Sequence, residues 1–417
     1  MLRFFENRLV TGRIDEIIAL IKEFYQTDSL YSIPTMDKLA VLCFALQINI
    51  NQLDILLSSN PQTVRTIKGH AFEIVFDRLM AANDVPVSEV GGDANIDRLI
   101  NGLSLQLKTP TVQGSSDSQV VYKTHKTHGA KSEQESMSYY SRVDEFADYL
   151  VGLVSYDPFK VVFIDRENLP RIETNANYIQ SPFTFDLIEN SEAINKFDAI
   201  GVGRFNVPSD FFSFDSSKEL LPLTAKSLGL KTDIIVDSIL RESNFRIWDM
   251  NIKGFARELA VRHFLEMAGI TIYDPSVAGK PRPEKSDLAL LSKQNNFVRF
   301  QVKGITLRGS KLDGENSIID IETQLSRGRV NDHPTQSRLY HFTDFEYLIL
   351  ALDPSYAKAY NTEIYGKGRY KWEYYCFPQG TLDRHHKYTE RIKSHQKLKY
   401  VDIQRYRIDS EWLKRWQ

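Results

Sequence analysis

An internal repeat constrains the fold of this chain more than any other feature, because a duplicated sequence builds the same structure twice. The segment IKGHAFEIVFDRLMAANDV (67–85) matches IKGFARELAVRHFLEMAGI (252–270), and this match aligns Glu73 with Glu258. Both segments have the apolar spacing of amphipathic helices. The sequence therefore predicts two copies of one unit, each of which opens with a helix that carries a glutamate.

A hairpin follows the first helix. In NIDRLINGLSLQLKTP (95–110), an Asn-Gly pair lies between two apolar runs, which is a strong signal for a two-residue hairpin turn. That register places Asp97 opposite Gln106, with Lys108 two residues further along the same face of the sheet. Leu103, Leu105 and Leu107 alternate with these residues and point to the other face. One face is therefore predicted to be apolar core, and the other gathers a carboxylate, a carboxamide and an ammonium group.

The second copy repeats this arrangement. In KSDLALLSKQNNFVRFQVKG (285–304), KQNN is the predicted turn, and a loop centred on Gln294 places Asp287 opposite Gln301, with Lys303 two residues on. For a single hairpin, a solvated polar face with an incidental ion pair would be the favoured interpretation. The ordered recurrence of Glu, Asp and Gln-x-Lys on equivalent elements favours a functional site.

The repeat extends in both directions. DEFADYLVGLVSYDP (144–158) resembles TDFEYLILALDP (343–354), and each is predicted to be a buried strand, an Asp-Pro turn and a further short strand. Residues 37–59 parallel residues 223–243, which have the pattern of a helix-turn-helix; a helical hairpin formed for packing alone is the favoured alternative. The predicted fold is α/β, with two tandem units, each a mixed β-sheet flanked by helices and preceded by a small helical module. The predicted boundaries are 1–66, 67–205, 206–251 and 252–417.

Composition limits the class of protein. The chain has 417 residues, too long for one ordinary domain, and its 42% apolar and 25% charged content is typical of soluble globular proteins. No apolar run is long enough to span a membrane, and the first residues lack the apolar core of a signal peptide, so a cytoplasmic location is expected. Cys43 and Cys376 are predicted to be core residues in a reducing compartment. The net charge of −2 means that any basic surface must be local.

The paired carboxylate and carboxamide suggest a particular chemistry. Hard oxygen ligands suit Mg²⁺, with Mn²⁺ able to substitute, and the helical glutamate completes a second shell or a second metal site. Phosphodiester cleavage needs a metal that polarises a phosphate oxygen and lowers the pKa of a bound water. A lysine beside the attacking water stabilises the developing charge. Glutamine can serve neither as a base nor as a charged ligand, so a modest metal affinity is expected.

This combination of residues resembles the PD-(D/E)XK nucleases, and more narrowly the Gln-x-Lys variant found in Mrr-like and other restriction-endonuclease-like proteins. The proline of the motif name is absent, because Ile96 and Ser286 precede the two aspartates. The resemblance covers roughly two-thirds of the chain through a short motif of moderate specificity. It implies a metal-binding role for Asp97, Gln106, Asp287 and Gln301. It implies that the catalytic set also includes Glu73, Lys108, Glu258 and Lys303.

Polar and basic segments follow each motif lysine. Arg and Lys bind phosphates, and Arg, Asn and Gln read base edges. A solvated loop explains any one of these residues alone, but DNA contact is the better interpretation of the set beside a nuclease-like site. A zinc site at His125 and His128 is disfavoured, because no third ligand lies close in the sequence. The candidate DNA-binding residues are Lys123, Lys126, Lys131, Arg308, Lys311, Arg327, Arg329 and Arg338.

The resemblance implies a Mg²⁺-dependent, sequence-specific double-stranded DNA endonuclease similar to type II restriction enzymes, with one active site per unit and per strand. A monomeric pseudo-dimer or a homodimer is expected, since cleavage of both strands takes two sites related by twofold symmetry. A cognate DNA methyltransferase acting separately is a candidate partner. The alternatives are a structure-specific or homing-type nuclease, an RNA-directed defence nuclease, and a non-catalytic DNA-binding protein on a nuclease scaffold.

Overall fold

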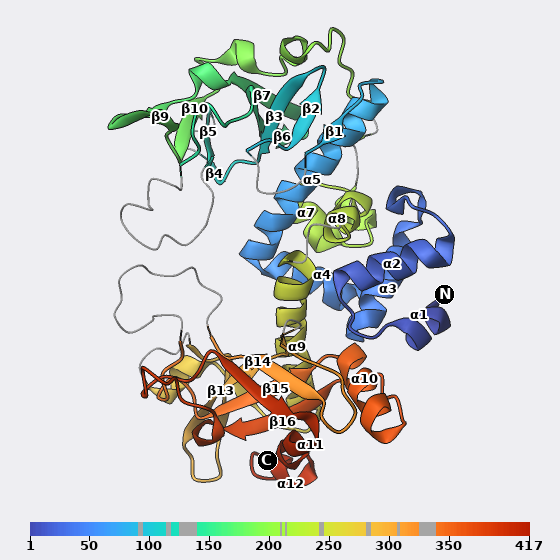
Figure 1. Ribbon diagram of the computed structural model, residues 1–417, viewed down its shortest axis with the longest axis vertical. Helices are drawn as coiled ribbons and strands as arrows, with labels where there is room; N and C mark the ends of the chain where they lie inside the picture. The colour runs from blue at the N-terminus through green and yellow to red at the C-terminus, as the bar shows by residue number, and fades with distance from the viewer. Residues whose placement is uncertain are drawn as a thin grey trace. The chain divides into compact units, whose positions relative to one another are not determined.

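The computed structural model divides the chain into two compact units. The middle unit comprises Leu57–Arg241, and the split unit comprises Met1–Leu56 together with Glu242–Gln417. Figure 1 shows the elements of both. The residues that the structure describes are 1–90, 95–113, 118–124, 140–208, 211–212, 215–241, 246–280, 285–306, 309–324 and 339–417.

The middle unit is built from one long helix and a mixed sheet. Helix α5 spans Pro61–Ala82. The sheet has the order β1-β2-β3-β6-β7, in which only β3 and β6 are parallel neighbours. Its strands are Ser88–Glu89, Arg98–Ile100, Leu103–Lys108, Tyr149–Tyr156 and Phe159–Asp165. Smaller strands are β4 Val112–Gln113, β5 Gln119–Tyr122, β8 Arg171–Ile172, β9 Asn175–Ile179 and β10 Phe183–Asp186.

The split unit repeats this plan. Its helix runs from the π-helical segment η7 (Arg246–Ile252) into α9 (Lys253–Met267), so its bounds match those of α5 when Glu258 is aligned with Glu73. The sheet order is β11-β12-β13-β15-β16, again with one parallel pair, β13 and β15. The strands are Ile272–Tyr273, Leu288–Leu291, Phe297–Lys303, Tyr347–Leu352 and Glu373–Pro378. The predicted α/β fold with two tandem mixed sheets is confirmed.

Each sheet is covered on both faces. In the split unit, Phe300 of β13 packs in one cluster with Val261 of α9, whereas Leu348 of β15 packs in another with Ile319 of β14. Strands β14 (Ile318–Glu322) and β17 (His395–Lys399) form a small second sheet. In the middle unit, the small sheet β10-β5-β4 takes the corresponding place. Because both faces are covered, side chains on the polar face of each hairpin are partly or fully buried.

Both predicted hairpin registers are confirmed. Arg98 pairs with Leu105 in the first hairpin, and Leu288 pairs with Phe300 in the second. The Asn-Gly turn has φ of 51° at Asn101 and 82° at Gly102, as a type I′ turn requires. Gln106 and Gln301 are each only 4% exposed, which excludes the interpretation of a solvated polar face at these two positions.

One Asp-Pro prediction is wrong. Asp157 and Pro158 connect β6 directly to β7, as expected, but Asp353 and Pro354 do not form a turn. Pro354 is instead the first residue of α10 (Pro354–Tyr365), a helix inserted before β16. Proline suits the first helical position because the N–H that it lacks has no partner there, so the same dipeptide opens a helix or a turn equally well.

The helical modules belong to different units. Helices α7 (Pro222–Leu228) and α8 (Thr232–Ile239) lie in the middle unit, where Arg78 on α5 forms ion pairs with Asp233 and Asp237 on α8. Helix α8 is almost entirely buried, which favours helical packing over reading of DNA. The four predicted boundaries remain a prediction. In the split unit lie α1 (Leu2–Arg8), α2 (Ile14–Tyr25), α3 (Thr35–Leu46), most of α4 (Ile50–Ser59), α11 (Tyr400–Ile403) and α12 (Ser410–Leu413).

Two further sequence predictions concern single features. Cys43 and Cys376 are buried and unpaired, which confirms them as core residues. Within the described ranges, no single helix has both the length and the apolar character needed to cross a membrane. The bent pair formed by α3 and α4 meets that test on length and composition only.

Candidate active site

The first hairpin brings Asp97 and Gln106 into direct contact. The Gln106 amide nitrogen donates a hydrogen bond of 2.5 Å to Asp97 Oδ2, and the Leu107 backbone N–H donates to the same oxygen at 2.7 Å. The Asp97 N–H in turn donates to the Leu105 carbonyl, which extends the ladder of the hairpin by one residue. The predicted pairing across the turn therefore holds at the level of atoms.

The second hairpin reproduces these contacts. The Gln301 amide nitrogen donates to Asp287 Oδ2 at 2.5 Å, and the Val302 N–H donates to it at 2.7 Å. The ammonium group of Lys303 lies 5.2 Å from the centroid of the Tyr340 ring. The two hairpins lie almost 200 residues apart in the chain. In each of them the equivalent aspartate accepts hydrogen bonds from a glutamine amide and from a backbone N–H.

Burial and neighbouring charge act against each other in these clusters. Burial raises the pKa of Asp97 and of Asp287, and the positive charges of Lys108 and Lys303 partly offset this. Burial also lowers the pKa of Lys303, although Asp287 lies close enough to raise it. A lysine of this kind gives up a proton more easily than a solvated one, which suits a group placed beside a reacting water.

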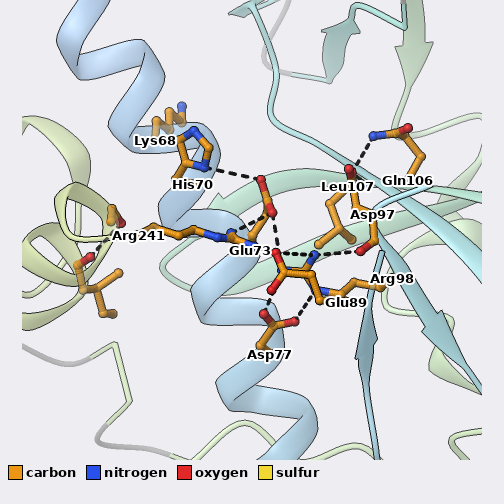
Figure 2. A network of polar contacts seen from close by, with 12 residues as sticks. Lys68, His70, Glu73, Asp77, Glu89, Asp97, Arg98, Gln106, Leu107 and Arg241 are labelled. Atoms are coloured by element: carbon orange, nitrogen blue, oxygen red, sulfur yellow. Dashed lines mark hydrogen bonds and ion pairs between the residues drawn. The ribbon is translucent and has the colours of Figure 1, made fainter. Parts of the chain in front are cut away.

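The helical acid of the middle unit lies in an arginine-rich network. In Figure 2, Glu73 of α5 contacts Arg98, Arg241 and His70, and Asp77 contacts Arg98. The Glu73 carboxylate lies 2.7 Å from Arg241 Nη1 and 3.3 Å from Arg98 Nη2. Asp77 accepts bonds of 2.7 and 2.8 Å from Arg98. Two guanidinium groups therefore neutralise the charge of Glu73.

The surroundings of Glu258, the helical acid of the split unit, differ from those of Glu73. Among the residues that the structure describes, no ion pair reaches Glu258. Burial and the nearby Asp287 carboxylate raise the pKa of Glu258 to about 7, against the opposing charges of Arg262 and Lys303. Glu258 and Asp287 thus form an acidic pair whose negative charge is only partly compensated.

The carboxylate and amide oxygens of Glu258, Asp287 and Gln301 fit a magnesium ion in the split unit. Considering only the described part of the chain, no hydrogen bond reaches Oδ1 of Asp97 or of Asp287, and no group of three or more His, Cys, Asp and Glu side chains forms a metal site by itself. Mg²⁺ suits such a sparse set, since it keeps several waters. The Gln301 amide would have to turn its oxygen toward the ion. In the middle unit the fit is poorer, because Glu73 is already paired.

The predicted DNA-binding residues are only partly described. Lys123 is exposed immediately after β5, and Lys311 is exposed and lies 3.1 Å from Asp313. Their contact with DNA remains a prediction. The other candidates fall outside the described residues; they are Lys126, Lys131, Arg308, Arg327, Arg329 and Arg338.

Sequence reasoning missed the arginines around the helical acids. Arg98 is only 1% exposed, and the hairpin pattern alone gives no sign that its guanidinium group is buried beside these acids. One signal was available in the repeat itself. Alignment of the two copies sets Asp77 against Arg262, and Arg98 against Leu288. One copy thus has an acid on the helix and a base on the strand, whereas the other has a base on the helix and an apolar residue on the strand. This exchange indicates that a buried positive charge is supplied by the strand in one copy and by the helix in the other.

No family model and no curated protein matches the chain. Among solved structures, the bacterial homing endonuclease I-Ssp6803I matches with 16% sequence identity and a TM-score of 0.24. The match covers 38% of this chain and 88% of that one. A similarity this weak carries no argument about activity, so the case for a function rests on the residues of the two hairpins and their helices.

Proposed function

We propose that this chain is a Mg²⁺-dependent endonuclease that hydrolyses phosphodiester bonds in double-stranded DNA, with one active site in each unit. The observation that carries the proposal is the recurrence of one buried arrangement. In each unit an aspartate accepts bonds from a glutamine amide and from the next backbone N–H, with a lysine two residues beyond the glutamine. A buried amide and carboxylate held in this way twice have no obvious structural purpose, since an apolar pair would pack as well.

Each side chain has a defined role in this proposal. Asp97 with Gln106, and Asp287 with Gln301, would hold the metal through their oxygens. When bound, Mg²⁺ polarises a phosphate oxygen and lowers the pKa of a bound water. Lys108 and Lys303 orient the attacking water and offset the negative charge that develops on the phosphate. Within the described residues neither lysine forms an ion pair with an acid, so replacing either one breaks no salt bridge of the fold.

Sequence specificity of the type II kind is part of the same proposal. The polar segments that follow Lys108 and Lys303 differ in length and in sequence, so the two units are suited to unlike half-sites. Cleavage of both strands needs two sites, which one chain can supply as a pseudo-dimer or two chains as a homodimer. A separate methyltransferase would then protect the host DNA.

Supercoiled plasmid DNA tests the proposal directly. The wild type, K108A, K303A and the double variant are incubated with plasmid in Mg²⁺, and in parallel in EDTA. Discrete linear fragments from the wild type, nicked circles from each single variant and intact plasmid from the double variant are expected. K160A and K397A are matched controls, because these lysines are exposed, Lys160 on β7 of the middle unit and Lys397 on β17 of the split unit.

Three other outcomes identify the alternatives. Intact plasmid in every lane, with binding still seen by gel shift, leaves a DNA-binding protein without nuclease activity. Cleavage only of branched or cruciform DNA supports a structure-specific nuclease. Cleavage of RNA at a greater rate than DNA in a parallel assay supports an RNA nuclease.

A further inference from the structure

Arg98 links the helix of the middle unit to the backbone beside the proposed active site. Its Nη1 donates a bond of 2.8 Å to the Asp97 carbonyl, while Nε and Nη2 bind the Asp77 carboxylate. The same guanidinium lies 3.3 Å from Glu73. One fork of donors thus connects two acids of α5 with the peptide group of the aspartate proposed to bind metal.

Arg262 makes the corresponding contact in the split unit, but from the opposite element. Its Nη2 donates a bond of 2.6 Å to the Asp287 carbonyl. Arg262 lies on α9, one turn after Glu258, at the position where the middle unit has Asp77. The strand position of Arg98 is occupied here by Leu288, which is fully buried in the core.

We infer that Arg98 and Arg262 are equivalent positioning residues, each of which fixes the backbone carbonyl of the proposed metal-binding aspartate. This inference rests on the proposed function. The target is the same carbonyl in both units, and the guanidinium lies beside the helical acid in both. Only the element that carries it has changed. Because a strand residue makes this contact in one unit and a helix residue makes it in the other, the site needs a guanidinium group at the carbonyl and not an arginine at one fixed position.

The arrangement has a physical purpose at a metal site. A hydrogen bond to the peptide of a ligand restricts the direction in which its carboxylate points, and groups of this kind typically account for about 10- to 100-fold in metal affinity or activity. The positive charge also reduces the repulsion between the helical acid and the aspartate before a cation binds. In the middle unit Asp77 is then needed only to hold Arg98, which explains why its counterpart can be an arginine.

Transplanting one arrangement into the other unit tests the inference. In a D287N/K303A background, which disables the proposed metal-binding aspartate and the lysine of the split unit, nicking of supercoiled plasmid and Mn²⁺ binding both report the middle unit. The variants R98L, D77R and D77R/R98L are compared there, and Mn²⁺ affinity is measured by electron paramagnetic resonance on the same proteins. R98L is expected to lower the nicking rate and the Mn²⁺ affinity by about 10- to 100-fold. D77R/R98L, which copies the split unit, is expected to recover at least about tenfold of that loss.

Two controls keep the result interpretable. R78L removes a neighbouring α5 arginine that pairs with Asp233 and Asp237, so it lowers stability without changing Mn²⁺ affinity. If R98L fails to fold by circular dichroism, R98K takes its place, since lysine keeps the charge but cannot form the fork. The reciprocal exchange, R262D/L288R against R262D in a D97N/K108A background, repeats the test in the split unit.

The outcomes separate the inference from the function on which it rests. A double exchange that is no better than R98L, in a chain whose wild type cleaves DNA and binds Mn²⁺, overturns the inference alone. An R98K or R98L variant that folds and keeps full Mn²⁺ affinity overturns it as well. A wild type that neither cleaves DNA nor binds Mn²⁺ overturns the proposed function, and the inference with it.

Discussion

Glu73 and Glu258 occupy the same position of matching helices, yet their surroundings differ. Glu73 lies between two guanidinium groups, with Arg241 at 2.7 Å. Glu258 has no ion pair among the described residues, and its pKa is raised to about 7. The duplicated fold therefore fixes the position of the helical acid. A few neighbouring residues decide whether arginines of the protein neutralise its charge or whether the charge stays available to a bound cation.

A second contrast lies one residue before each acid. In the split unit Arg257 binds Asp353 through two bonds of 2.8 and 2.9 Å, and Lys253 lies 3.5 Å from the same carboxylate. Burial raises the pKa of Asp353, but the two cations more than offset this and hold it below its usual range. In the middle unit Phe72 stands in the place of Arg257 and is buried in apolar surroundings.

The largest expected effect comes from breaking that buried cluster. D353A leaves Arg257 and Lys253 buried without their partner, which should lower the free energy of unfolding of the split unit by about 3–5 kcal/mol. All four tryptophans lie in the split unit, so urea unfolding followed by tryptophan fluorescence reports on it. D383A, which removes an exposed partner of Lys393, should change it by less than about 1 kcal/mol. Equal losses in the two variants would contradict the structure.

The next effect is a pH dependence that belongs to Glu258. In EDTA, the folded state keeps a proton on Glu258 up to about pH 7, whereas the unfolded state releases it near 4.5. Because folding then disfavours the charged form, the free energy of unfolding of the split unit should fall as pH rises from about 4.5 to 7, by on the order of 2 kcal/mol. E258Q should flatten this slope.

The measurement is again tryptophan fluorescence in urea, now at several pH values. E266Q is the matched control, because Glu266 lies exposed on the same helix. Its slope should equal that of the wild type. If E258Q kept the wild-type dependence of the free energy of unfolding on pH, Glu258 would not be buried as the structure shows. The contrast between the two helical acids would then be wrong as well.

The affinity for Mn²⁺ should also differ in its response to loss of the helical acid in the two units, with a smaller change in free energy. E258Q removes an acid that is free to attract a metal, so it should weaken Mn²⁺ binding by on the order of tenfold, which corresponds to about 1.4 kcal/mol. E73Q should weaken it much less, because Arg98 and Arg241 already neutralise Glu73. Titration of Mn²⁺ by electron paramagnetic resonance compares the variants. A greater loss of Mn²⁺ affinity in E73Q than in E258Q would mean that Glu73, and not Glu258, is the acid that attracts the cation.

The parts that sequence could predict are those encoded locally. The hairpin registers follow from the Asn-Gly turn and from strand alternation, and the paired helices follow from the repeat. The charge networks could not be predicted in this way, because they join residues far apart in the chain; Arg241 is 168 positions after Glu73 (241 − 73 = 168). Asp353 shows the limit at short range, since Asp-Pro opens a helix there and a turn at Asp157.

The smallest effect concerns the arginine that distinguishes the middle unit. His70 has a pKa lowered to about 4, first by burial and then by the charge of Arg241, while Asp97 and Glu89 raise it. R241A removes the charge and admits water, so both lowering causes weaken together. The pKa of His70 should therefore rise toward its ordinary value of 6.5.

Nuclear magnetic resonance follows this through the imidazole carbon-bound protons, with H70N assigning the resonance among nine histidines. R78A is the control, since Arg78 faces α8 and not His70. An unchanged His70 titration in R241A would mean that Arg241 does not lie over the helical acid in solution. Glu73 would then keep only Arg98 as a partner, at 3.3 Å, and the contrast between the two helical acids would be smaller than the structure indicates.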